Sequence, residues 1–370
     1  MIPFSTESVS MLVQPLRALE ARATPTPARE PEHRVAVLLN ANARKVDARV
    51  VKTLSHVVPA QDLFLSRSEL DCRRIIQTVL ERNYTRVFTG GGDGTFMGFV
   101  NEMFRQLEPR GRFSGKRAPS FGVLKLGTGN GLANHVHASG GEDGLLRDVT
   151  RARAGKVPGS KRMELLLVDG QRSPFAGLGV DGKLLNDFLW VKQHLGRGPL
   201  KHLLSGVGGY FSAVTLRTVP HYLTHSTWVG CEVVNGSAGE AWRVGPHGVP
   251  VGAPIAPGET IFKGDLMMAA AATMPFYGYG LRMFPFAGER PGMMQLRLGQ
   301  LPPTSILAHL PQLWTGRWFP EGLHDFYARE VHIRFTRPMP FQVGGDAAGY
   351  RQEVKLGMAP ESVELMDFEG

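Results

Sequence analysis

The chain has few cysteines and no long apolar run, and both shortages exclude classes of protein. Cys72 and Cys231 are its two cysteines among 370 residues, and they lie far apart in the sequence. We therefore expect neither a disulfide framework nor a cysteine-based metal site. We expect the protein to work in a reducing compartment. No apolar run approaches the ~20 residues that a membrane-spanning helix needs. The first residues also lack the basic start and apolar core of a signal peptide, so we expect a cytoplasmic protein without a transmembrane segment.

Motifs of several other functional classes are also missing. The sequence contains no G-x-x-x-x-G-K-[ST] phosphate loop, no G-x-S-x-G nucleophile turn and no zinc-finger or RNP1-like motif. His135 and His137 have no further metal-binding residues beside them in the sequence, so we interpret them as polar or packing residues. Residues 177–182 fit G-x-G-x-x-G by letter, but they do not open a βαβ unit, and we interpret the match as a coincidence.

The charge and the glycine content point toward a phosphate-bearing ligand. The net charge is +9 and the pI is near 9.7, which favours partners such as nucleotide phosphates or anionic lipid headgroups. Lys and Arg are spread along the chain and form no tail, so nucleic acid is not expected as a partner. The 45 glycines exceed the usual share of about 7% and predict tight turns and close approaches of the backbone to a ligand.

The distribution of apolar residues predicts a tail followed by two domains. Residues 1–33 are interpreted as a tail and linker because residues 24–31 are rich in proline, with a short interfacial helix as the alternative. In residues 34–157, strands alternate with helices, which predicts an α/β domain with a parallel sheet. Residues 158–370 are predicted to form a mostly antiparallel β domain. In one version of this prediction, its last residues pack on the first domain instead. The predicted strands of the first domain are 35–39, 62–65, 86–89 and 120–126, and its helices are 47–57, 69–82 and 96–107.

The second domain is predicted from short apolar runs between turns. Its best helical pattern covers residues 183–195. Its predicted strands are 163–168, 175–180, 227–234, 266–273, 294–298, 331–335 and 341–343.

Two glycine-rich loops carry the chemistry. Residues 90–95 (Gly-Gly-Gly-Asp-Gly-Thr) and residues 127–130 (Gly-Thr-Gly-Asn) each follow a predicted strand of the parallel sheet, where ligands bind in such folds. Glycines let backbone N–H groups approach phosphate oxygens, and the helix expected to begin near Phe96 adds the positive end of its dipole. The hydroxyls of Thr95 and Thr128 can donate to phosphate. Asp93 can bind Mg²⁺ or accept a proton from an attacking hydroxyl. The alternative is that both loops are plain turns.

With these loops the sequence resembles the diacylglycerol kinase catalytic-domain superfamily, which includes sphingosine and ceramide kinases. Four segments occur in the family's order. Residues 38–44 (Leu-Leu-Asn-Ala-Asn-Ala-Arg) resemble its first nucleotide loop, residues 91–95 its G-G-D-G-T, residues 126–133 its G-T-x-N-D-x-A, and residues 344–346 (Gly-Gly-Asp) its late D-G-E. The G-G-D-G-T alone is shared with NAD kinases, whereas the ordered set is more specific to lipid kinases.

The resemblance implies a Rossmann-like nucleotide-binding domain followed by a β-sandwich-like lipid-substrate domain, with ATP in the cleft between them. It implies transfer of the γ-phosphoryl group from ATP, with Mg²⁺, to the hydroxyl of diacylglycerol, a sphingoid base or ceramide. The enzyme would then visit the membrane surface as a peripheral protein, and a homodimer is an open expectation. The residues implied to bind ATP are Asn40, Asn42, Gly90, Gly91, Gly92, Asp93, Gly94, Thr95, Gly127, Thr128, Gly129 and Asn130.

The acidic residues leave alternatives open. The resemblance implies either Asp93 or Asp346 as the general base, Asp93 as the metal ligand, and Asp181 as a contact to the lipid headgroup, with a plain turn aspartate as the alternative for Asp181. Ala347 and Ala348 replace the Gly and Glu that follow the aspartate of the late motif, and Gly131 replaces an aspartate usual in diacylglycerol kinases. Two rival functions therefore remain: a soluble-substrate kinase of the NAD kinase type, and a family member that binds nucleotide or lipid without turnover.

Overall fold

A four-stranded parallel sheet forms the first part of the computed structural model, which describes residues 34–127, 130–180, 182, 228–277 and 280–369. Its strand order is β2-β1-β3-β4, and every neighbouring pair is parallel. All four strands therefore end at the same edge of the sheet. The strands are β1 (Val35–Asn40), β2 (Leu63–Ser66), β3 (Arg86–Gly90) and β4 (Ser120–Leu124).

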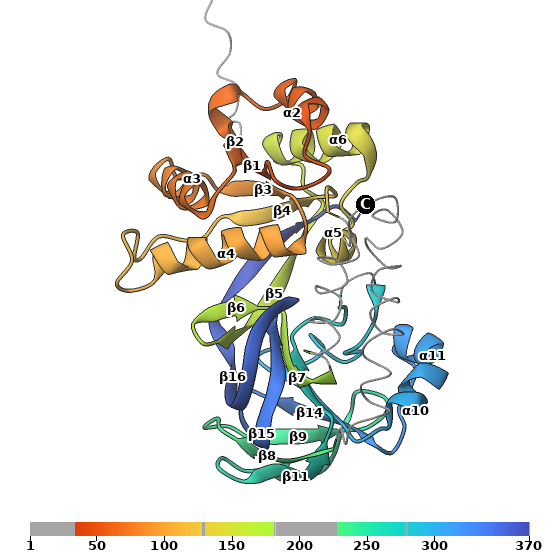
Figure 1. Cartoon of the computed structure of the whole chain (residues 1–370). Helices are drawn as coiled ribbons and strands as arrows, with labels where there is room; N and C mark the ends of the chain where they lie inside the picture. The colour runs from red at the N-terminus through yellow and green to blue at the C-terminus, as the bar shows by residue number, and fades with distance from the viewer. Residues whose placement is uncertain (1–33, 128–129, 181, 183–227, 278–279, 370) are drawn as a thin grey trace, which may run out of the picture.

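Helices cover both faces of this sheet (Figure 1). On β1, Ala36 and Leu38 point to the face packed by helices α3 and α4, whereas Val35, Val37 and Leu39 point to the face packed by α2 and α6. This alternation follows from the two-residue period of a strand, and burial on both faces explains the continuous apolar run. The helices are α2 (Ala48–Ser55), α3 (Glu69–Glu81), α4 (Asp93–Leu107) and α6 (Gly141–Arg153).

Local sequence explains where these helices begin. Asp47 caps α2, because its side chain accepts a hydrogen bond from Val50 N at 2.9 Å, and Ser68 caps α3 in the same way. Helix α4 begins at Asp93, three residues before the predicted start. Its first helical hydrogen bond runs from Phe96 N to Gly92 O, so the second half of the glycine loop is the first turn of the helix.

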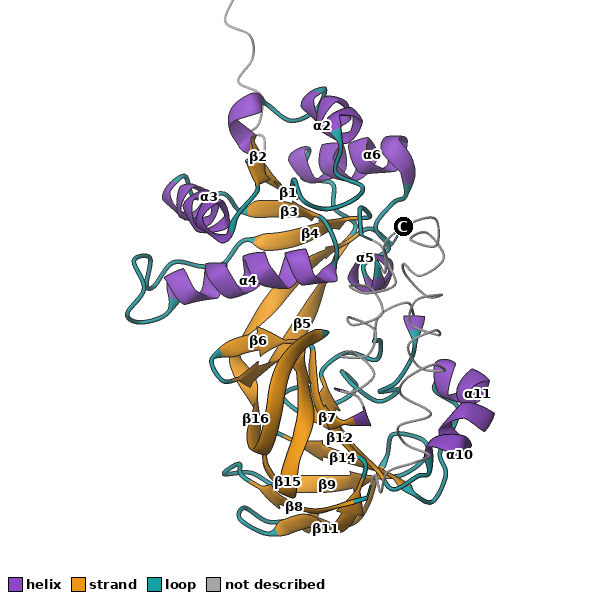
Figure 2. Cartoon of the chain, in the orientation of Figure 1, coloured by secondary structure: helices purple, strands orange, loops and turns teal. Residues whose placement is uncertain are grey.

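The second part of the described chain is rich in antiparallel strands (Figure 2). Short helices η1 (Ala60–Asp62), α5 (Gly131–His135), α10 (Pro303–Ala308) and α11 (Leu310–Trp314) complete the described elements. The strands are β5 (Gly159–Val168), β6 (Gln171–Ser173), β7 (Phe175–Gly179), β8 (Val229–Asn235), β9 (Ala241–Val244), β10 (Pro250–Ile255), β11 (Thr260–Leu266), β12 (Met268–Ala272), β13 (Met294–Gly299), β14 (Leu323–Ala328), β15 (Glu330–Val343) and β16 (Asp346–Asp367).

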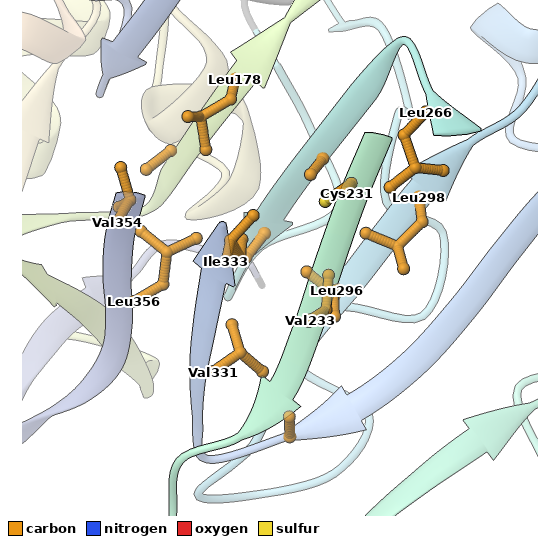
Figure 3. Packing of buried hydrophobic residues seen from close by; sticks show 14 of the residues in the cluster. Leu178, Cys231, Val233, Leu266, Leu296, Leu298, Val331, Ile333, Val354 and Leu356 are labelled. Carbon is orange, nitrogen blue, oxygen red and sulfur yellow. The ribbon is translucent and has the colours of Figure 1, made fainter. Parts of the chain in front are cut away.

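A large apolar core holds many of these strands together. Figure 3 shows side chains from β7, β8, β13, β15 and β16 converging on one another, among them Leu178, Val233 and Ile333. All three of these side chains are fully buried. The apolar runs that predicted strands in this half therefore supply part of its core, and strands that were not predicted, such as β14 and β16, supply the rest.

Strand β16 joins the two parts. It starts in the β15–β16 hairpin, pairs with β15 and β5, and near its end pairs in parallel with β4 through Leu365 and Phe121. Val363 and Leu365 then lie in the core on one face of the first sheet, and Phe368, just beyond the strand, lies in the core on the other. The ring of Phe368 stacks on Phe88 of β3 at 6.0 Å.

The predicted fold class is confirmed: an α/β part of Rossmann type is followed by a strand-rich part. The domain boundaries stay a prediction. The tail at residues 1–33 and the helix predicted at 183–195 lie outside the described residues. Among the residues that the structure describes, no helix combines the length and the apolar character needed to cross a membrane.

Candidate nucleotide-binding cleft

The two glycine loops lie against each other at the carboxyl edge of the parallel sheet. A Cβ atom on Gly127 would lie 2.7 Å from Gly92 Cα and 2.9 Å from Gly91 O. Both of these neighbours are backbone atoms, so neither can move without moving a loop. Glycine at position 127 is therefore what lets the loops that follow β3 and β4 meet.

The loop after β1 is tied to the first turn of α4. Asn40 Nδ2 donates to Thr95 Oγ1 at 3.0 Å, and Asn40 Oδ1 accepts from Asn42 N at 2.9 Å. As an acceptor toward Asn40, the Thr95 hydroxyl keeps its own hydrogen for another partner. A Cβ on Gly91 would lie 2.6 Å from Thr95 Oγ1, so this glycine leaves room for the Thr95 side chain.

The loop after β2 completes this edge of the sheet, and no role was predicted for it from the sequence. Asn42 Nδ2 donates to Arg67 O at 2.9 Å, which links the loops after β1 and β2. The sequence did contain an indication that this loop belongs to the site, because the polar residues 66–68 directly follow a predicted strand.

The Asp93 carboxylate faces helix α5. Its Oδ2 accepts from Gly131 N at 3.1 Å and its Oδ1 accepts from Leu132 N at 3.2 Å. Burial raises the pKa of Asp93 above its ordinary value, against the effect of these two N–H groups, which favour the charged form. Asp93 therefore connects the start of α4 to the start of α5.

The loop that follows β4 closes on itself through Asn130. Asn130 has a left-handed backbone with φ of 50°, and its Oδ1 accepts from Gly127 N at 2.8 Å. Asn tolerates this conformation better than most residues. Thr128 and Gly129, two of the predicted phosphate-binding residues, lie outside the described residues, as does Asp181.

Asp346 stands at the tip of the β15–β16 hairpin. Gly344 and Gly345 form the two-residue turn, with φ of 61° and 89°, and Val343 pairs with Asp346 across it. Positive φ at both turn positions explains the two glycines. Asp346 is exposed, and its carboxylate has no hydrogen bond or ion pair to any residue in the described ranges.

Buried side chains hold this turn in place. Gln342 is fully buried, its Oε1 accepts from Gly345 N at 3.0 Å, and its Nε2 donates to the Tyr277 hydroxyl at 3.3 Å. Gly344 N donates to Phe175 O at 2.9 Å. The tip that carries Asp346 is therefore anchored to β7 and to the segment that contains Tyr277.

These elements border a cleft of about 850 Å³ between the parallel sheet and the strand-rich part. Five of the predicted site residues line it: Asn40, Asn42, Gly94, Thr95 and Asp346. Asp93 and the described residues of the loop after β4 are not in its lining. The fold thus brings Asp346 to the same cleft as Asn40 and Thr95, and turns the carboxylate of Asp93 away from it toward α5.

Arg172 of β6 joins the two walls of the cleft, although its sequence neighbourhood did not single it out. It is 3% exposed and forms ion pairs with Glu108 at 3.2 Å and Glu361 at 2.9 Å. The Asn101 side chain of α4 also pairs with the Arg172 backbone, accepting from its N at 2.7 Å and donating to its O at 2.8 Å. Helix α4 is thereby fixed to β6 and β16.

A cluster beside the first sheet has the ligand types of a metal site but already contains a cation. Ligand atoms of His137, Asp367 and Glu369 lie within 4.8 Å of one another. The sequence did not predict this cluster, because Asp367 and Glu369 lie far from His137 along the chain. Lys161 Nζ lies 3.0 Å from Asp367 Oδ2, and His137 Nδ1 lies 2.8 Å from Asp367 Oδ1. The ammonium group supplies the positive charge that these carboxylates need, so the cluster is an ion-pair network.

The first part of the chain is similar to a known family. Residues 34–158 match the family model described as the diacylglycerol kinase catalytic domain. The predicted resemblance is therefore confirmed for this part, and the match supports a kinase. No protein with curated annotation matches the chain in sequence.

Solved structures agree with this assignment at the level of the fold. A diacylglycerol kinase from Bacillus anthracis str. Sterne is 12% identical with a TM-score of 0.56, and the alignment covers 92% of this chain and 98% of that one. At this identity the similarity shows a shared fold alone. An NAD kinase from Archaeoglobus fulgidus in complex with ATP is 11% identical over 90% of this chain and 94% of that one. Its TM-score of 0.43 is too low to support an argument.

Proposed function

We propose that this chain is an ATP-dependent lipid kinase, which transfers the γ-phosphoryl group of ATP to the hydroxyl of diacylglycerol, a sphingoid base or ceramide. The observation that carries the proposal is the cleft in which an exposed carboxylate, Asp346, faces the Asn40–Thr95 edge of a diacylglycerol kinase catalytic domain. Phosphate-binding groups and a proton acceptor on opposite walls of one cleft are what phosphoryl transfer to an alcohol requires.

The phosphates would lie along the edge where the parallel strands end. There the backbone N–H groups of residues 93–95, which precede the first helical hydrogen bond of α4, and the free hydrogen of the Thr95 hydroxyl are available to phosphate oxygens. The unpaired N–H groups of a helix start favour negative charge. Residues 127 and 130 would shape this edge by bringing the second loop against the first.

Asp346 would act as the general base. As the lipid oxygen forms its bond to the γ-phosphorus, its proton passes to the Asp346 carboxylate, and the bond from the γ-phosphorus to the bridging oxygen breaks to release ADP. Asp346 is exposed, whereas both oxygens of Asp93 accept backbone N–H groups. We therefore infer that Asp93 positions α5 and the loop after β4, and that Asp346 takes the proton.

The oxygen donors of the cleft fit Mg²⁺. This ion prefers oxygen ligands and is commonly held by one or two carboxylates together with substrate phosphates. Glu69 and Asp169 also line the cleft. One of these carboxylates would hold the ion in place of the Asp93 predicted from the sequence, because Asp93 is engaged with α5 and Asp346 is assigned to the proton. When bound, Mg²⁺ would neutralise charge on the phosphates of ATP.

A panel of acceptors tests the proposal. Purified protein, Mg-ATP and vesicles containing diacylglycerol, sphingosine or ceramide are expected to give a phosphorylated lipid. Transfer to NAD alone would instead support the soluble-substrate rival. Intact ATP binding without transfer to any acceptor would rule out the proposed function. Peripheral association with membranes, cytoplasmic localisation, a homodimer and a lipid contact by Asp181 belong to the proposal as well.

One observation favours the rival without turnover. Asp-Gly is a preferred pair for a two-residue hairpin turn with positive φ at both positions, and here those positions are Gly344 and Gly345. In that register the aspartate of the late D-G-E motif falls on Gly344, and Asp346 takes the place of its glutamate. A wild type that binds ATP without turnover, together with activity gained by Gly344→Asp, would establish this second candidate function.

A further inference from the structure

Four arginines line the cleft, and their partners differ. Arg73 lies 3.8 Å from Glu102, Arg105 also pairs with Glu102, and the pairs of Arg172 were described above. The guanidinium of Arg67 has no hydrogen bond or ion pair to any residue within the part of the chain that the structure describes. Arg67 is exposed. Arg67 is therefore the cleft arginine whose guanidinium has no ion-pair partner among the described residues, whereas Arg73 and Arg105 share the carboxylate of Glu102.

The backbone of Arg67 is fixed on both sides. Its carbonyl oxygen accepts from Asn42 Nδ2 at 2.9 Å, and its N–H donates to Asp71 Oδ2 at 3.0 Å. Asp71 lies in the first turn of α3, where its own N–H is bound by the Ser68 hydroxyl at 3.1 Å. A backbone held in this way restricts the volume that the guanidinium can reach, which lowers the entropy lost when it binds a ligand.

The hydrogen bonds also place Arg67 relative to the phosphate-binding edge. A continuous series runs from Thr95 through the Asn40 and Asn42 side chains to the Arg67 carbonyl. Thr95 and Arg67 thus mark two ends of one connected surface on the cleft wall. Because Arg67 lines the same cleft as Thr95, its guanidinium is a candidate contact for a ligand that extends from Thr95 along this wall.

We propose that Arg67 binds the phosphate chain of the nucleotide in this cleft. A guanidinium offers a planar set of donors that matches phosphate oxygens, and such charge-assisted bonds are stronger than neutral ones. A nucleotide polyphosphate provides the negative charge that no acidic residue of the described chain supplies to Arg67. The proposal rests on the proposed function for the identity of the nucleotide as ATP, and it makes Arg67 a binding residue of that site.

Calorimetric titration of ATP into the full-length wild type, Arg67→Ala and Arg73→Ala tests the assignment. Arg73 is the matched control, because it lines the same cleft but is paired with Glu102. Arg67→Ala is expected to weaken ATP binding by about tenfold, the factor expected for loss of a charged hydrogen bond at an exposed site. Arg73→Ala is expected to change it much less. Equal affinities of the two variants for ATP would overturn the proposal.

Adenosine separates a phosphate contact from a contact to the base or ribose. We expect Arg67→Ala to bind adenosine as the wild type does, and Arg67→Lys to recover part of the ATP affinity. The loss in Arg67→Ala should shrink at high salt because ionic contacts at exposed sites are screened. An equal loss for adenosine and ATP would also overturn the proposal. These titrations contain no lipid, so they test the Arg67 assignment separately from the proposed function. A wild type that binds ATP but phosphorylates no lipid would refute the proposed function, and the ATP titrations of the Arg67 variants would still decide the Arg67 assignment.

Discussion

The two walls of the cleft are built in different ways. On the sheet wall, the groups available to a ligand come from loops that follow consecutive parallel strands, and short hydrogen bonds such as Asn40 to Thr95 connect them. The opposite wall contributes the tip of one hairpin, and buried partners such as Gln342 hold that tip from below. The first wall offers backbone N–H groups and hydroxyls together with charged side chains of α3 and α4, and the second offers the exposed carboxylate of Asp346 at a hairpin tip. We infer that the sheet wall binds the nucleotide and the hairpin wall carries the reactive group.

The largest effect is expected at the hairpin wall. Asp346→Asn keeps the size of the side chain and removes its capacity to take a proton. If Asp346 is the general base, the turnover number should fall by a factor of about 100 to 10,000, while calorimetry shows ATP still bound. An Asp346→Asn enzyme with wild-type turnover would contradict this assignment. The inference that the hairpin wall carries the reactive group would then be wrong.

The next largest effect is expected where the two glycine loops meet on the sheet wall. Gly127→Ala places a methyl group against the backbone of Gly91 and Gly92, and overpacking of this kind costs about 1–3 kcal/mol. Gly94→Ala, in the first turn of α4, is the control, because its Cβ would meet nothing within 4 Å. Urea unfolding should show a lower free energy of unfolding for Gly127→Ala alone. Equal stability of both variants would mean that the loops do not depend on this contact.

A smaller effect is expected from Asp93→Asn, which tests the acid on the sheet wall. Asparagine retains one oxygen acceptor for the two N–H groups of α5, so we expect a loss of about 1 kcal/mol, as for other helix caps. Turnover should fall far less than in Asp346→Asn, and a larger fall than in that variant would reverse the roles that we assign to the two acids.

The pH dependence of the same variant tests the environment of Asp93. Burial raises the pKa of Asp93, so the folded protein holds this proton at a pH where the unfolded chain has released it. The wild type should therefore lose stability relative to Asp93→Asn as the pH rises from the ordinary value of 3.8 through the raised one. Chemical-shift titration of the carboxyl group measures that pKa directly, and a value below 3.8 would contradict the argument.

The last prediction concerns the reactivity of Cys72, which lines the cleft on the sheet wall. Burial raises the pKa of its thiol to about 11, from an ordinary value of 9.0. The thiolate is the reactive form, so labelling at about pH 8 should be slower than for an ordinary thiol by about 100-fold and should rise steadily with pH. Mass spectrometry after iodoacetamide treatment measures this rate, with Cys72→Ser as the control. ATP should slow the labelling further, and labelling that ATP leaves unchanged would argue against nucleotide binding in this cleft.

Much of the sheet wall could be predicted from the sequence because it is locally encoded. Each strand of the parallel sheet is a short apolar run with a polar or glycine-rich loop directly after it, so the predicted glycine loops do follow β3 and β4. The start of α4 was placed three residues late, because glycine and aspartate in a first helical turn look like a loop. Helix α6 was missed for a related reason: it begins at Gly141 and contains Gly144.

The contacts that assign roles could not be predicted in this way. The hydrogen-bond partners of Asp93 lie 38 and 39 positions after it in the chain, and no local sequence pattern predicts them. The hairpin turn at Gly344 and Gly345 was recognised only as a variant of a motif, although paired glycines between apolar runs also indicate a two-residue turn. The role of Arg172 could not be predicted for the same reason. Its partners are distant in sequence: Asn101 lies in α4, Glu108 directly follows α4, and Glu361 lies in β16.

The return of β16 to the first sheet sets the order in which the molecule can fold. During synthesis the four parallel strands leave the ribosome early, but the residues that complete their cores, Leu365 and Phe368 among them, are made much later. Pairings between such distant segments form slowly, because a long loop must close first. The part of the chain that the family match covers, residues 34–158, therefore keeps some of its apolar surface uncovered until β16, which begins at the cleft, has been synthesised.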